Sequence, residues 1–184
     1  MLRGNKELWL AFLAMALITG IYALVVFFTR AIPPAGELFG HGIGIVGFVL
    51  MMMTETLYSL RKRSRTVKWG RMSTWLQLHI FTGIVGPYMA LLHTSWKFNG
   101  IAGATTLLTI IIVVSGFIGR YVFTRIPRTM DGLEIEGTLS QEALKQARRL
   151  LALWHTVHIP IGIALFISAF VHVGAALYYA TLLK

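Results

Sequence analysis

Five long apolar stretches dominate the sequence, and they limit what the chain can fold into more than any other feature. They cover residues 8–29, 38–60, 74–94, 101–124 and 151–183. A helix needs roughly 20 mostly apolar residues to cross the hydrocarbon core of a bilayer. Inside lipid, every backbone N–H and C=O must be paired within the protein, which a helix achieves. The stretches therefore predict an all-α integral membrane protein, a single domain built as a bundle of five transmembrane helices.

The composition supports a membrane protein. Hydrophobic residues make up 56% of the chain and charged residues only 13%, whereas a soluble domain carries roughly 25% charged residues. The first stretch follows a basic N-terminus, as the core of a signal peptide does. It is longer than the roughly 7–15 apolar residues of such a core, however, and no A-x-A-like site closes it. We therefore expect the first stretch to remain as a membrane helix.

The seventeen basic residues are distributed unevenly between the two sides of the predicted bundle. If the N-terminus is cytoplasmic, all of them except Arg30, Lys97 and Lys184 lie on the cytoplasmic side. Such an asymmetry sets the orientation of a multi-pass protein, and it predicts a periplasmic C-terminus in a bacterial inner (cytoplasmic) membrane. The net charge of +10 is thereby explained by the lipid bilayer and its anionic headgroups, so no nucleic acid is expected as a partner.

The connection formed by residues 125–150 mixes acidic and basic side chains, which predicts an aqueous cytoplasmic loop. Within it, residues 138–141 fit a helix-capping box, and the residues that follow have a helix-forming composition. A short helix is therefore expected to lead directly into the fifth span. The loop can be a solvated connector or a docking surface for a partner, and the solvated connector is the simpler interpretation.

Glycines are frequent at the start of the second span, at positions 36, 40, 42, 44 and 47. Glycine lets another helix, or a flat ligand, approach the backbone of a membrane helix closely. Tight packing against a neighbouring helix is the simpler explanation of this run.

Four of the six histidines form two pairs with the same spacing, His79 with His93 in the third span and His158 with His172 in the fifth. Each pair is 14 positions apart, which is about 40° short of four helical turns and about 21 Å along the axis. Both members of a pair therefore share one helix face and lie near opposite edges of the hydrocarbon. Because the third and fifth spans run in the same direction, His79 is expected to face His158, and His93 to face His172.

Small residues accompany these histidines. Gly83 and Gly162 lie one turn after the inner histidines, and Ala90 and Ala169 lie nearly one turn before the outer ones. A fifth small residue, Gly86, lies midway between His79 and His93. A porphyrin is a broad flat plate, so small residues beside its ligands would give it room between the helices.

The repeated spacing predicts two b-type haems held between the third and fifth helices. For any one of the histidines, an ordinary packed or polar-network role is the alternative, although polar residues inside a membrane are functional candidates by default. Zinc or copper is disfavoured because the separation of about 21 Å keeps both histidines of one helix from one ion, and no carboxylate cluster completes a shell. The chain has no cysteine, which excludes covalent haem attachment and thiolate-bound iron–sulfur clusters.

With this pattern, the sequence resembles the ferric-reductase-like transmembrane family of di-haem b cytochromes, mainly over residues 75–125 and 154–179. The quinol-oxidising cytochrome b proteins have a similar spacing. The resemblance implies that His79, His93, His158 and His172 are the axial ligands of two haem b groups. The sequence departs from the reductases of this family in having no obvious sixth span and no FAD- or nicotinamide-binding domain, so a reductase activity of the chain itself is not expected.

The expected function is transmembrane electron transfer, as the membrane subunit of a larger oxidoreductase complex. Its partners would be the other subunits of that complex, a quinone or a cytoplasmic donor on one side, and a periplasmic electron carrier on the other. Whether the chain is itself an enzyme stays open, and no catalytic residue is predicted.

Haem propionates are anionic and need cationic partners, which arginine supplies in a fixed bidentate geometry. The candidates are Arg120, Arg125 and Arg71 for the inner haem and Lys97 for the outer one. Membrane topology and lipid headgroups explain the same residues equally well.

Three further residues are candidates for contact with a quinone or for proton transfer: His155, Glu55 and His41. Simple interfacial histidines, and an ion pair between Glu55 and a loop arginine, are the simpler alternatives. Two other functions therefore stay open. One is a quinone-reactive oxidoreductase subunit with its own quinone site, and the other is a haem-free membrane scaffold or transporter subunit.

Overall fold

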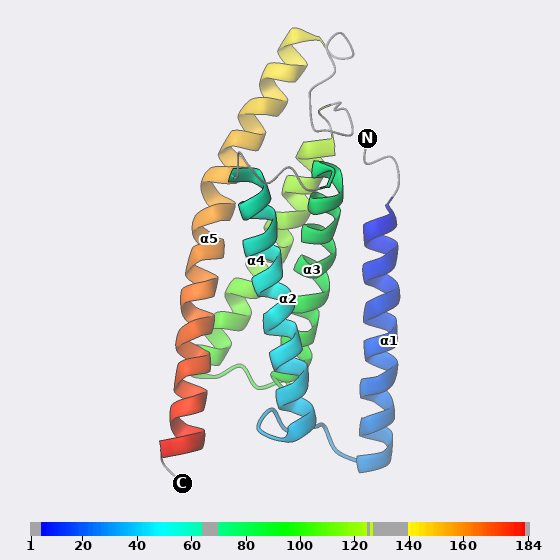
Figure 1. The fold of residues 1–184 in the computed structure, drawn as a ribbon, viewed down its shortest axis with the longest axis vertical. Coiled ribbons are helices and arrows are strands. Elements are labelled where there is room, and N and C mark those ends of the chain that lie inside the picture. Colours follow the sequence, from blue (N-terminus) through cyan, green and yellow to red (C-terminus); the bar gives the residue numbers. More distant parts are fainter. Residues whose placement is uncertain (1–4, 64–69, 125, 127–139, 183–184) are drawn as a thin grey trace.

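The computed structural model describes residues 5–63, 70–124, 126 and 140–182, and within them the chain forms five α-helices and no strand. All five are long and apolar enough to cross a membrane, so the predicted all-α architecture with five membrane-length helices is confirmed. Figure 1 shows them side by side, with α1 at one edge of the bundle. They are α1 (Lys6–Thr29), α2 (Leu38–Arg63), α3 (Met72–His93), α4 (Gly100–Thr124) and α5 (Gln141–Leu182).

Helix α5 begins well before the predicted span. It runs without interruption for 42 residues, about 63 Å, which is twice the thickness of the hydrocarbon core. Figure 1 shows its first turns extending past the ends of the other helices. The N-cap is Ser140, whose Oγ accepts a hydrogen bond from the Ala143 N–H at 3.2 Å. The expected short helix is thus the beginning of α5, with Ser140 as its cap; Thr138 lies outside the described residues.

The helices pack as two antiparallel hairpins, with α2 along α3 and α4 along α5. Helix α1 lies against α3, and α3 also touches α4. Over the described residues, no comparable contact joins α3 to α5. The two histidine-bearing helices are therefore the second helices of the two hairpins, parallel to each other and not packed directly together.

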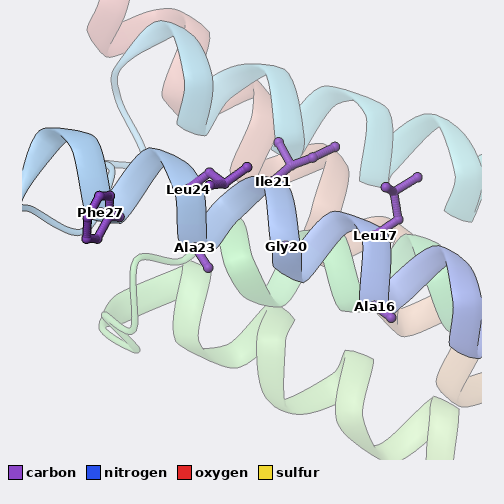
Figure 2. A pocket seen from close by; sticks show the side chains of 7 residues that line it. All are labelled: Ala16, Leu17, Gly20, Ile21, Ala23, Leu24 and Phe27. Carbon is purple, nitrogen blue, oxygen red and sulfur yellow. The ribbon is translucent and has the colours of Figure 1, made fainter.

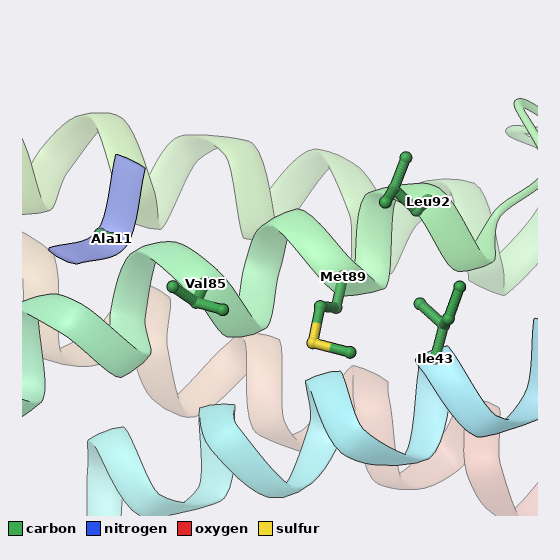
Figure 3. Packing of buried hydrophobic residues seen from close by; sticks show 5 residues of the cluster. All are labelled: Ala11, Ile43, Val85, Met89 and Leu92. Carbon is green, nitrogen blue, oxygen red and sulfur yellow. The ribbon is translucent and has the colours of Figure 1, made fainter. Parts of the chain in front are cut away.

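Glycine sets the close crossing of α2 and α3. A Cβ atom added to Gly47 would lie 3.0 Å from the Gly86 carbonyl oxygen, and one added to Gly86 would lie 3.0 Å from the Gly47 carbonyl oxygen. The explanation of the glycine run in α2 by helix packing is therefore confirmed at Gly47. Beside this crossing lies the buried apolar cluster of Figure 3, contributed by α1, α2 and α3: Ala11, Ile43, Val85, Met89 and Leu92.

Helix α1 is attached to the bundle by polar contacts at two levels. The Thr19 hydroxyl lies 2.5 Å from the Tyr88 hydroxyl of α3. Near the start of α1, Arg120 Nη2 of α4 forms an ion pair with Glu7 Oε1 at 2.5 Å, with the Glu7 side chain only 2% exposed. Between these levels α1 is apolar, and Ala11 joins it to the buried cluster with α2 and α3.

The outer surface of α1 is apolar and exposed. Figure 2 shows a shallow groove on this helix around Gly20, lined by residues of α1 alone. All of the lining residues are exposed, and a Cβ atom at Gly20 would meet nothing within 4 Å. Lipid-facing surfaces of membrane helices have this apolar character.

Candidate functional site

The histidines of α3 and α5 fall within electrostatic range of each other in the two combinations that their spacing predicts. His158 of α5 lies close enough to His79 of α3 for a charge on one ring to act on the other. His172 and His93 have the same relation, and all four side chains are half-buried. We call the end of the bundle where α2 ends and α3 begins the basic end, after Arg61, Lys62 and Arg63. The first pair lies toward the basic end, and the second toward the opposite end.

Three of the four rings use Nδ1 for a hydrogen bond to a neighbouring helix. His79 Nδ1 lies 2.8 Å from the Thr54 carbonyl oxygen of α2, and His93 Nδ1 lies 2.9 Å from the Gly40 carbonyl oxygen of α2. A carbonyl oxygen only accepts, so Nδ1 carries the proton in both rings and Nε2 keeps a free lone pair. Metal-binding histidines are held in this way, with the other ring nitrogen donating to a carbonyl or similar acceptor.

The two histidines of α5 have different surroundings. His158 Nδ1 lies 3.0 Å from the Ser115 hydroxyl of α4. His172 makes no hydrogen bond to a described residue. The orientation of His158 is therefore fixed by a side chain, whereas His79 and His93 are fixed by the backbone of α2.

Glycine in α2 makes room for the His93 ring, a role that was not predicted. A Cβ atom at Gly44 would lie 2.7 Å from His93 Nδ1, and Gly40, one turn earlier, supplies the carbonyl that accepts its hydrogen bond. The spacing of four between Gly40 and Gly44 marks one helix face and was the available signal. This glycine spacing indicates that α2 is the helix that supports His93. The spacing of the histidines does not identify that helix.

On α3, the small residues face α2. A Cβ atom at Gly83 would lie 3.2 Å from Thr54 Cγ2, and Ala90 N lies 3.0 Å from where a Cβ atom of Gly47 would be. Gly86 is buried at the helix crossing. Contact with α2 already requires a small residue at Gly86, and its role beside a porphyrin stays a prediction.

On α5, the glycine near His158 is not in a tight helix crossing. Gly162 and Ala169 are buried, and a Cβ atom at Gly162 would come no closer than 3.9 Å to Glu55 Oε2 and Ile112 Cδ1. Gly162 is therefore not required by tight helix packing, in contrast to the glycines of the α2–α3 crossing.

The predicted cations have different surroundings. Arg120 Nη2 forms the ion pair with Glu7, with the Asn5 side-chain oxygen 3.2 Å from the same atom, and its contact with a haem propionate stays a prediction. Arg71 is exposed at the N-cap of α3, and Lys97 is exposed in the turn after α3. Arg125 lies outside the described residues.

The carboxylate of Glu55 reaches from α2 into the space beside the His79 pair. It acts electrostatically on His79, and its Oε2 lies near Gly162 of α5. Within the described residues Glu55 has no ion-pair partner. The Tyr58 ring lies one turn further along α2, with its centroid 5.1 Å from that of His79, and Lys62 Nζ lies 5.9 Å from the Tyr58 ring. Polar groups of α2 thus extend from the basic end to His79.

The other two histidines lie next to paired ones. The His41 ring centroid is 6.3 Å from that of His93, and the side chain of His41 is exposed. His155 stacks on Trp154 at 4.7 Å. The Trp154 indole lies between α4 and α5, where its Nε1 donates to the Ser115 carbonyl oxygen at 2.7 Å.

No protein-family model, curated protein or solved structure matches the chain.

Proposed function

We propose that the chain is the membrane subunit of a redox complex and transfers electrons across the bilayer through two b haems, each held by one histidine of α3 and one of α5. The observation that supports this most is the pairing of His79 with His158 and of His93 with His172. Histidines with unrelated packing roles would not be expected to form two cross-helix pairs at the same spacing.

The hydrogen bonds of the rings fit such ligation. His79 and His93 are fixed with Nε2 free, and their Nδ1 donors are satisfied by carbonyl oxygens of α2. In both rings the N–H group is on Nδ1 and already has its acceptor. The lone pair of Nε2 is therefore available to bind iron. When bound, each haem would be held by one histidine of α3 and one of α5, and it would supply an iron that takes up and releases one electron.

The separation of the pairs fits passage across a membrane. Along α3 the two histidines are about 21 Å apart, so each pair lies nearer to one edge of a hydrocarbon core of roughly 30 Å. By the positive-inside rule the basic end is cytoplasmic, which would place the His79 pair toward a quinone or a cytoplasmic donor. The His93 pair would then serve a periplasmic electron carrier.

The proposal predicts a coloured protein. Purified from a membrane with haem supplied, the full chain should contain about two haems, and reduction should produce the absorption bands of low-spin six-coordinate iron. Haem content per chain and a spectroelectrochemical titration measure this. A well-folded preparation without haem would instead favour a membrane scaffold or transporter subunit.

A second candidate function is favoured by Glu55. Its carboxylate lies beside the His79 pair, within reach of α5, and a quinol that gives up electrons must also give up protons. The chain would then be a quinone-reactive subunit, with Glu55 as the proton acceptor and Tyr58 beside it.

Replacement of Glu55 separates this candidate from a pure electron conduit. If quinol is oxidised at this place, Glu55→Gln should slow the reduction of haem by a water-soluble quinol at least tenfold, because the amide cannot accept the proton. Glu37→Gln, an exposed carboxylate at the opposite end of the bundle, is the matched control. Equal rates in both variants would exclude Glu55 from quinol chemistry.

A further inference from the structure

A hydrogen-bonded cluster formed by α4 and α5 surrounds one face of His158. Trp154 Nε1 donates to the Ser115 carbonyl oxygen at 2.7 Å and lies 3.2 Å from the Ser115 Oγ. The same Oγ lies 3.0 Å from His158 Nδ1. The Ser115 hydroxyl therefore connects the indole to the imidazole.

The indole is fixed by shape as well as by its hydrogen bonds. Its ring lies 4.5 Å from that of His158 at an interplanar angle of 30°. Gly119 leaves the space that the indole fills, since a Cβ atom there would overlap the Trp154 ring. Gly119 is buried and Trp154 half-buried, so this tryptophan is part of the interior of the α4–α5 hairpin.

Helix packing alone does not account for the direction of the Ser115 hydroxyl. The hydroxyls of Thr106 and Thr109 on the same helix donate to carbonyl oxygens four residues earlier, at 2.9 and 2.8 Å. This is the ordinary arrangement for serine and threonine in membrane helices. Ser115 instead directs its oxygen at His158, which makes it a partner of that ring.

The partner determines how electron-rich the imidazole is. A strong acceptor at Nδ1–H raises the basicity of the ligating nitrogen, which stabilises oxidised iron and lowers its reduction potential. His79 and His93 donate to backbone carbonyls. The acceptor for His158 is a hydroxyl that already lies within hydrogen-bond distance of the indole N–H, so it is weaker.

We propose that Ser115 and Trp154 are positioning residues for His158, and that they hold its ring for haem ligation and set the reduction potential of the haem at the basic end. Ser115 lowers this potential as the acceptor for Nδ1–H, and Trp154 raises it by competing for the same hydroxyl oxygen. The inference rests on the proposed function, because it needs a haem on His158. It adds a means by which one of the two haems is adjusted separately from the other.

The test compares two variants that act in opposite directions. Ser115→Ala removes the acceptor but keeps the backbone carbonyl that holds the indole, so one midpoint potential should shift positive and the other stay unchanged. Trp154→Phe removes the indole N–H, which frees the hydroxyl to accept more strongly, so the same potential should shift negative. Ser115→Thr, which keeps the hydroxyl, should restore the original value.

Potentials are measured by spectroelectrochemical titration, and the g values of the two low-spin ferric signals by electron paramagnetic resonance. Thr106→Val, which removes a hydroxyl bonded to its own helix, is the control and should change neither. If the chain holds two haems and Ser115→Ala leaves both potentials and both sets of g values unchanged, the inference is wrong and the proposed function stands. A chain without haem overturns the proposed function itself.

Discussion

Alanine at His93 is expected to lower the haem content from about two per chain to about one, and alanine at His158 to remove the other haem instead, because an iron that needs two axial histidines loses its site with either. The pairing also predicts which variants should have matching spectra. His172→Ala should give the same remaining spectrum and potential as His93→Ala, since these two rings lie within electrostatic range of each other and are proposed to hold the same haem. His79→Ala should match His158→Ala in the same way.

Two histidines of the same chain serve as controls for this experiment. His41 and His155 lie beside His93 and Trp154, respectively, and neither belongs to a cross-helix pair with the predicted spacing. His41→Ala and His155→Ala should keep about two haems per chain, as expected for residues that are not axial ligands. Loss of a haem in either control, or retention of both in His93→Ala, would show that the ligands are assigned to the wrong histidines.

The positions of the histidines on α3 and α5 could be predicted from the sequence because they depend on helix geometry alone. Spacing along one helix fixes the rotation and the rise between two residues, and the number of spans fixes which helices run parallel. Neither inference requires knowledge of which helices are in contact. The membrane-length helices were likewise predictable from apolar length, and the start of α5 at Gln141 was predictable from the capping box at residues 138–141, which hydropathy does not show.

What the sequence left undetermined is helix-to-helix contact. Gly86 lies on the same face of its helix as His79 and His93, and it was interpreted as space for a ligand. In the structure the neighbour of Gly86 is Gly47 of α2, a contact that the spacing of the histidines does not predict. Likewise, Ser115 is one hydroxyl among several on α4, and only its position beside His158 distinguishes it. Such roles depend on which surfaces meet, and a single sequence does not encode that in any local pattern.

The ion pair between Glu7 of α1 and Arg120 of α4 is another contact between helices that no local sequence pattern predicts. Its loss is expected to have the largest effect on stability. Glu7 is 2% exposed and the Arg120 side chain 13% exposed. Two of their atoms, Glu7 Oε2 and Arg120 Nε, are buried with no hydrogen-bond partner among the described residues. The pair is therefore desolvated with little other support. Arg120→Ala would leave a buried carboxylate without its counter-charge, which costs about 3–5 kcal/mol.

Arg120→Ala should accordingly lower the thermal unfolding midpoint of the protein in detergent and make α1 more accessible to protease. The double variant Glu7→Gln/Arg120→Met removes both charges, and because an uncharged pair of similar volume can replace a buried ion pair at little cost, it should recover most of the lost stability. Lys6→Ala, an exposed cation next to Glu7, controls for net charge. If the double variant were as unstable as Arg120→Ala, the loss would come from packing around the arginine stem, and the buried charge would not be its cause.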